Sequence, residues 1–153
     1  MLSTKLRSCY FAISLLTISG TSIAQIDLSL YTSNYDKGEY QQVVNDLKLL
    51  TFDSFSPKHY ELYVSSFSRI DLDDAEDAAE RAITAYDDNA QMYLLHGRVM
   101  GQQASGSIFS ALGYAKRALA SFKKATNLEP TNTKYLNALM SFYLMAPSIA
   151  GGD

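Results

Sequence analysis

The chain has 153 residues, of which 47% are hydrophobic and 12% aromatic, and its formal net charge is −3. This length allows one compact domain or a short array of repeats, and the apolar content argues against a wholly disordered chain. The acidic balance, with no basic stripe, argues against binding nucleic acid through its phosphates.

Residues 1–24 are predicted to be a signal peptide. Lys5 and Arg7 precede an apolar stretch, residues 10–18, that has the length of a signal-peptide core. The segment ends in small residues of the kind that a signal peptidase reads, so we expect cleavage after Ala24 and a periplasmic or secreted product. The alternative is an N-terminal membrane anchor. Because the stretch is shorter than the roughly 20 apolar residues of a membrane span, we favour the cleaved signal and expect no stable span after cleavage.

The expected mature chain, residues 25–153, contains no cysteine, because the single Cys9 lies in the signal. A disulfide, a thiolate metal site and a cysteine nucleophile are therefore not expected. Without Lys5 and Arg7 the chain keeps 11 basic and 16 acidic residues, a formal net charge of −5.

From Ser29 onward the apolar residues recur every three or four positions, which predicts helices and no strand. Ser56 and Pro57 form a helix start, and Pro130 blocks continuation of the helix before it. The predicted helices cover residues 40–50, 57–70, 75–86, a segment starting at 90, a segment starting at 107 or 114 and ending at 127, and 133–145.

Two of these helices share a spacing of small and aromatic residues. Ala75, Ala79 and Ala82 are matched 43 positions later by Ala118, Phe122 and Ala125, and Tyr93 and Gly97 open the helix that follows the first set. This pattern resembles the tetratricopeptide repeat family, over about residues 31–143. The resemblance implies an all-α fold in which antiparallel helical hairpins stack as a short solenoid over residues 25–153.

The 43-residue spacing exceeds the family period of 34. We favour an extended hairpin in which about nine extra residues fall within 100–114. A second register fits the spacing but discards Tyr93 and Gly97, and it uses as one repeat Gly106, Phe109, Ala118, Phe122, Ala125 and Pro130. The first repeat, residues 31–50, has the family's turn at Gly38 but only a short first helix.

Residues with catalytic chemistry are sparse. His59 and His96 are the only histidines, and they lack the spacing of paired metal ligands. No nucleophile motif occurs. We therefore expect no metal, no cofactor and no catalytic activity.

The resemblance implies that the first helix of each pair lines a groove that binds a protein or peptide. Val64 and Phe67 are two of the groove candidates, and together with Leu94 they are equally compatible with the core. The other groove candidates are Tyr60, Gln91, Leu94, Arg98, Lys134, Asn137 and Ser141. We expect an exported adaptor or assembly scaffold, and the alternative is a truncated, noncatalytic repeat domain of a larger enzyme or secretion system.

The last helix, residues 133–145, is apolar on both faces, and the last repeat looks incomplete. We expect either a missing hairpin or a face that binds another chain, including a second copy in a homodimer. The alternative is that the preceding hairpin wraps this helix completely.

Overall fold

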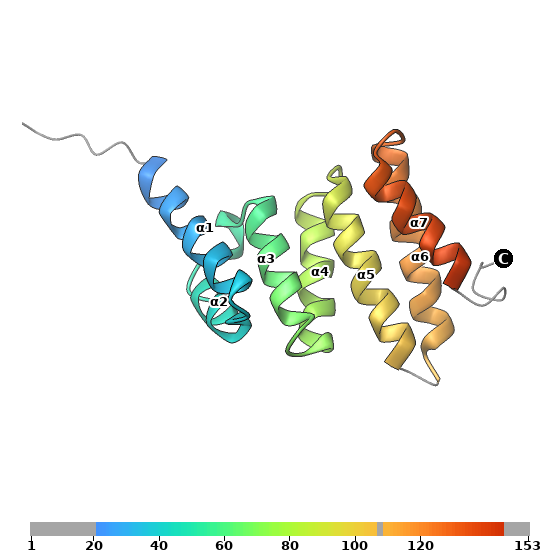
Figure 1. Ribbon diagram of the computed structural model, residues 1–153, viewed down its shortest axis with the longest axis horizontal. Coiled ribbons are helices and arrows are strands. Elements are labelled where there is room, and N and C mark those ends of the chain that lie inside the picture. The colour runs from blue at the N-terminus through green and yellow to red at the C-terminus, as the bar shows by residue number, and fades with distance from the viewer. Residues whose placement is uncertain (1–20, 107–108, 146–153) are drawn as a thin grey trace, which may run out of the picture.

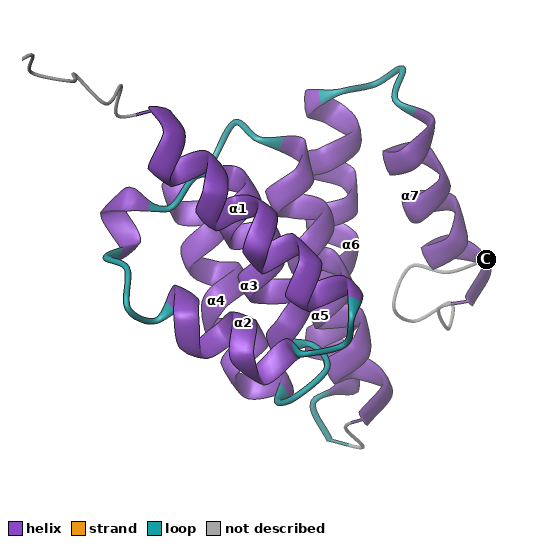
Figure 2. Cartoon of the chain, turned by 60° about the vertical axis from the view of Figure 1, so that its left-hand side comes forward, coloured by secondary structure: helices purple, strands orange, loops and turns teal. Residues whose placement is uncertain are grey.

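The computed structural model describes residues 21–106 and 109–145, with side chains from residue 28 onward. Within these ranges the chain is all-α, as predicted, and Figure 2 shows helices and loops without a strand. The helices are α1 (Thr21–Asp36), α2 (Tyr40–Leu47), α3 (Pro57–Phe67), α4 (Leu72–Ala85), α5 (Ala90–Gly106), α6 (Ala111–Leu128) and α7 (Thr133–Met145), with a 3-10 turn at Phe52–Ser54. The predicted signal peptide lies largely outside the described residues, and the expected cut after Ala24 falls in the first turn of α1.

Local sequence explains where the helices begin. The Ser56 hydroxyl accepts a hydrogen bond from the His59 backbone, and the His59 ring accepts one from the Ser56 backbone, which makes a capping box ahead of α3. Asp71 caps α4 by accepting from the backbone of Asp73 and Asp74. Gly38, at φ +81°, makes the turn between α1 and α2.

The helices stand in a row with two layers and are joined at alternating ends, with the longest connection, residues 48–56, between α2 and α3 (Figure 1). Each odd-numbered helix packs on the next odd one, α1 on α3, α3 on α5 and α5 on α7. Among the described residues, α2, α4 and α6 contact only their neighbours along the chain. The odd helices therefore form a continuous layer, and the even helices cover it from one side.

Small residues set the close packing at the centre of the row. Ala79, Ala82, Ala118 and Ala125 are all fully buried. The Phe122 ring of α6 lies directly over Gly97 of α5, where an added Cβ would come within 2.6 Å of a ring carbon. The repeat spacing therefore marks helix–helix contacts.

Helices α5 and α6, of 17 and 18 residues, are the longest described helices and pack along each other. This is the extended hairpin favoured above. The alternative register is wrong, because Gly106 ends α5 and Phe109 lies in the turn, with its side chain almost fully exposed. The first helix differs from the expectation too, since α1 is 16 residues long and not short.

Candidate functional site

Polar side chains contact one another across the odd-helix layer, near the start of α3, α5 and α7. The ammonium of Lys134 donates to the Gln91 side-chain oxygen at 2.5 Å, and the Gln91 amide donates to Glu61 at 3.4 Å. Glu61 also pairs with Lys58 at 3.0 Å. These four side chains form a polar ladder that crosses three helices.

Three further candidates lie on the same layer and are exposed. Arg98 is seven residues after Gln91 on α5, and Asn137 and Ser141 are three and seven residues after Lys134 on α7, so the helical repeat places each set on one face. Within the described residues Arg98 makes no side-chain hydrogen bond or ion pair, so its charge is available to a partner. We define the odd-layer surface by Lys58, Glu61, Gln91, Arg98, Lys134, Asn137 and Ser141.

Four of the predicted groove residues are core residues. Leu94 is 0% exposed, and Tyr60 packs edge-on against Phe55 and Tyr86. Burial raises the pKa of the Tyr60 hydroxyl, with a smaller contribution from Tyr86. These side chains support the surface from below and do not reach solvent. Val64 and Phe67 are buried as well.

Lys58 and Glu61 were not among the predicted groove residues, although their positions relative to the helix start could have identified them. Lys58, Gln91 and Lys134 are each the second residue of their helix. Counting from the Ser56 cap would have placed Lys58 and Glu61 on the odd-layer surface and Tyr60 in the core.

The odd-layer surface continues into a hollow of about 730 Å3 between α1 and the start of α3. Its apolar contribution comes from Leu28, and Lys58 connects it to the polar ladder. The residues that line it are Leu28, Ser29, Thr32, Ser33, Asp36, Lys37 and Lys58.

A second polar cluster is centred on His96 of α5 and connects this helix to α4 and α6. A hydrogen bond of 2.7 Å connects the His96 ring to the Ser121 hydroxyl, and the other ring nitrogen lies 3.1 Å from Glu80. Arg117 bonds to Glu80 and, at 2.5 Å, to Glu76. The partners of His96 lie 16 and 25 residues away in sequence, so no short sequence motif predicts the cluster.

Serine, histidine and carboxylate in this order invite comparison with a catalytic triad. A nucleophile must meet its substrate, yet Ser121 and His96 are both buried and only Glu80 is exposed to solvent. Burial raises the pKa of Glu80, but hydrogen bonds and charges from His96 and Arg117 outweigh it, so the pKa lies below its usual value. The cluster therefore holds an ionised carboxylate between α4, α5 and α6, which is a structural arrangement.

No group of three or more metal-ligating His, Cys, Asp or Glu side chains occurs in residues 21–106 and 109–145. None of the helices in that part of the chain is long and apolar enough to cross a membrane. No protein-family model matches the chain, and a search of curated proteins also found no match.

Proposed function

We propose that this chain is an exported helical-repeat protein of the tetratricopeptide type, which binds a protein partner or peptide along its odd-layer surface. The observation that carries the proposal is the polar ladder from Lys58 to Lys134, because it joins side chains from three successive helices on one surface. A segment lying across α3, α5 and α7 would meet these groups in turn.

The exposed groups suit polar recognition. Arg98 is exposed and offers five donors that no described residue accepts, and the exposed Asn137 and Ser141 can both donate and accept hydrogen bonds. The two-layer packing supports the repeat assignment, since each hairpin leaves a face that the next one covers. Export rests on the predicted signal peptide, residues 1–24, and an adaptor or scaffold role follows from binding without catalysis.

Site-specific crosslinking in the producing cells tests this proposal. A photoreactive residue placed at Asn137 should give an adduct of defined mass, whereas the same residue at Asp77, on the outside of α4, should not. Arg98→Glu should lower the yield of that adduct several-fold without changing the unfolding midpoint.

The matched control is Arg81→Glu, which reverses an exposed charge on α4, four residues after Asp77 and on a helix outside the odd layer. Its adduct yield should equal that of the unmodified chain. Equal yields from Asn137 and Asp77, or a yield that ignores charge reversal at both Arg98 and Lys134, would show that partners bind elsewhere.

A further inference from the structure

The histidine at the start of α3 accepts a hydrogen bond that a protonated ring cannot accept. The Ser56 backbone N–H donates to Nδ1 of His59 at 3.0 Å, and the Ser56 hydroxyl oxygen lies 2.8 Å from the same nitrogen. A backbone N–H is always a donor, so Nδ1 carries a lone pair and the ring is neutral. The capping box of α3 therefore requires one protonation state of this side chain.

Packing holds the His59 ring against two other segments. The side chain is buried, and the ring centroids of Phe55 and Tyr31 lie 5.6 Å and 6.2 Å from its own. Phe55 belongs to the connection between α2 and α3, and Tyr31 belongs to α1. A proton on Nδ1 would leave one N–H facing another. The Ser56 hydroxyl can rotate to accept from a charged ring, but the backbone N–H cannot reverse, so the ring and the Ser56 backbone must separate.

Charged side chains of both signs lie around this end of α3. They come from α3 itself, from α1 beside the hollow, from the 3-10 turn and from α4, which places an arginine over the Phe52 ring next to Phe55. Helix α5 contributes the uncharged Gln91. The charged residues are Lys58, Glu61, Asp36, Lys37, Asp53 and Arg81. Because three are positive and three negative, hydrogen-bond geometry is the main difference between the neutral and the charged ring.

The other titratable groups nearby leave this balance unchanged. On the α2 side, Asp46 accepts from Gln42, and Lys48 lies over the Phe67 ring at the far end of α3. Phenols pack against the His59 ring or against Phe55, and they are those of Tyr31, Tyr60 and Tyr63. Among these side-chain types only imidazole ordinarily titrates between about pH 5 and pH 8. The surrounding charges therefore stay constant while His59 titrates.

The second histidine has a different arrangement. In His96, Nδ1 meets the Ser121 hydroxyl and Nε2 meets the Glu80 carboxylate, which Arg117 also contacts. A hydroxyl and a carboxylate can both accept an N–H, so this ring can gain a proton without losing a partner. Of the two histidines in the chain, His59 is the one whose hydrogen bond fails on protonation.

We propose that His59 makes the start of α3 a pH-responsive element, in which protonation of the ring opens the capping box and moves the first turn of α3 away from the connection and α1. That turn carries Lys58 and leads directly into Glu61, so the first two groups of the polar ladder move with it. The expected consequence, weaker partner binding in acid, rests on the proposed function. The opening of the cap does not.

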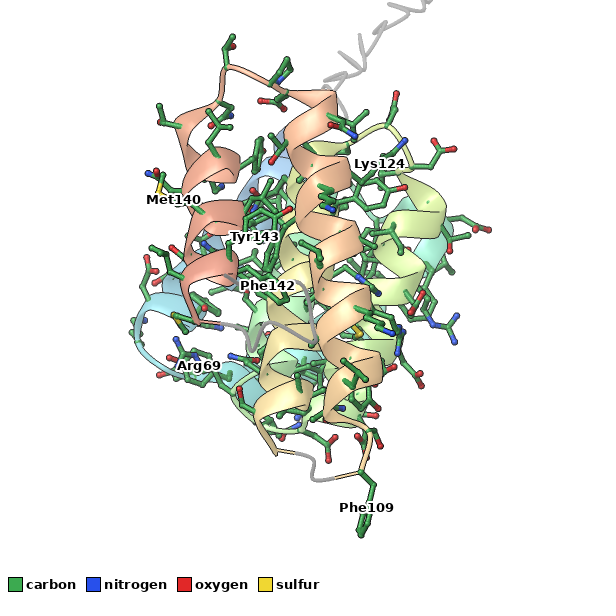
Figure 3. All side chains as sticks on the ribbon, turned by 90° about the vertical axis from the view of Figure 1, so that its right-hand side faces the viewer. Arg69, Phe109, Lys124, Met140, Phe142 and Tyr143 are labelled. Carbon is green, nitrogen blue, oxygen red and sulfur yellow. The ribbon has the colours of Figure 1, made fainter. Side chains whose placement is uncertain are left out.

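Nitrogen NMR of the unmodified chain tests the opening without a partner. Nδ1 of His59 should be unprotonated at about pH 7.5 and protonated at about pH 5. The protection factor of the Ser56 amide against hydrogen exchange should fall about tenfold over the same range. The amides of Phe142 and Tyr143 are the internal control, because α7 contains no histidine and lies at the end of the row shown in Figure 3. Their protection factors should not change.

His59→Gln is the matched variant. Glutamine at this position of a capping box also accepts from the Ser56 backbone, and it does not titrate. The urea midpoint of the unmodified chain should fall relative to that of His59→Gln between about pH 7.5 and about pH 5, because the unfolded chain binds the proton freely and the capped helix does not. His96→Gln should still show the response of the unmodified chain.

Three results would overturn the proposal. They are a protonated His59 ring with an unchanged Ser56 protection factor, a ring that stays neutral down to about pH 5, and the same pH dependence of the urea midpoint with and without His59→Gln. The NMR measurement needs no variant, so it decides the question even where His59→Gln does not fold.

Crosslinking from Asn137 at the two pH values separates this element from the proposed function. An adduct yield that falls in acid and recovers in His59→Gln would support control of binding by the cap. A constant yield while the cap opens would show that the partner does not use the first turn of α3. No adduct at either pH would contradict the proposed function and leave the NMR result standing.

Discussion

Helices α5 and α7 belong to the same layer, and α7 is the more apolar of the two, yet α5 buries eight residues and α7 only Tyr135. The difference follows from position in the row. Helix α5 contacts α3, α4, α6 and α7, whereas α7 contacts, among the described helices, only α5 and α6. In a stacked array the number of neighbouring helices determines burial, so apolar content alone identifies neither core nor surface.

The largest expected effect tests the difference between α5 and α7 directly, by making the same leucine-to-alanine substitution in each helix. Leu94→Ala in α5 removes a fully buried side chain and should lower the free energy of unfolding by about 2–5 kcal/mol. Leu144→Ala in α7 removes a largely exposed one and should change it by less than about 0.5 kcal/mol. Urea unfolding of both variants is the measurement, and similar losses would mean that α7 is covered in solution.

The sequence predicted the helices well because their starts depend on local chemistry. The Ser56–Pro57 start and the stop before Pro130 both rest on contacts within a few residues. Helix α2 ends three residues before the predicted Leu50 and α4 begins three before the predicted Ala75, since end fraying and caps shift boundaries.

Burial was harder to predict, because it depends on helices distant in sequence. Leu94 lies between Gln91 and Arg98 on the helix surface, and periodicity alone places all three together. Only the packing of α3 and α7 beside α5 separates the buried Leu94 from its polar neighbours. The His96 cluster shows the same limit, since its partners come from α4 and α6.

A smaller effect on stability is expected from glycine-to-alanine substitutions at two positions within α5. Gly97→Ala would place a Cβ 2.6 Å from the Phe122 ring, and overpacking of this kind costs about 1–3 kcal/mol, offset by about 1 kcal/mol of helix propensity. Gly101→Ala, one turn later, meets no atom within 4 Å and should be neutral or stabilising. Thermal unfolding compares the two variants.

Combining Gly97→Ala with Phe122→Leu separates a clash from other causes. The smaller side chain makes room for the Cβ, so the double variant should be more stable than the sum of the two single changes predicts. Strict additivity would show that α5 and α6 are not in contact at this point.

The smallest expected effect concerns Glu80, whose carboxylate is stabilised in the folded chain by His96 and Arg117. Because its pKa lies below the usual 4.5 in the folded chain, this stabilisation is complete above pH 4.5 and is lost as the pH falls through the folded-state pKa. Glu80→Gln should therefore be less stable than the unmodified chain at neutral pH and approach it in acid. The difference should be modest, since the side chain is 44% exposed and water screens the charges. Asp77→Asn, on the same helix but without a described ion pair, should show no such convergence in urea midpoints measured from neutral to acidic pH. A Glu80→Gln deficit that stays constant with pH would mean that packing, and not the ionised carboxylate, accounts for the contribution of this side chain.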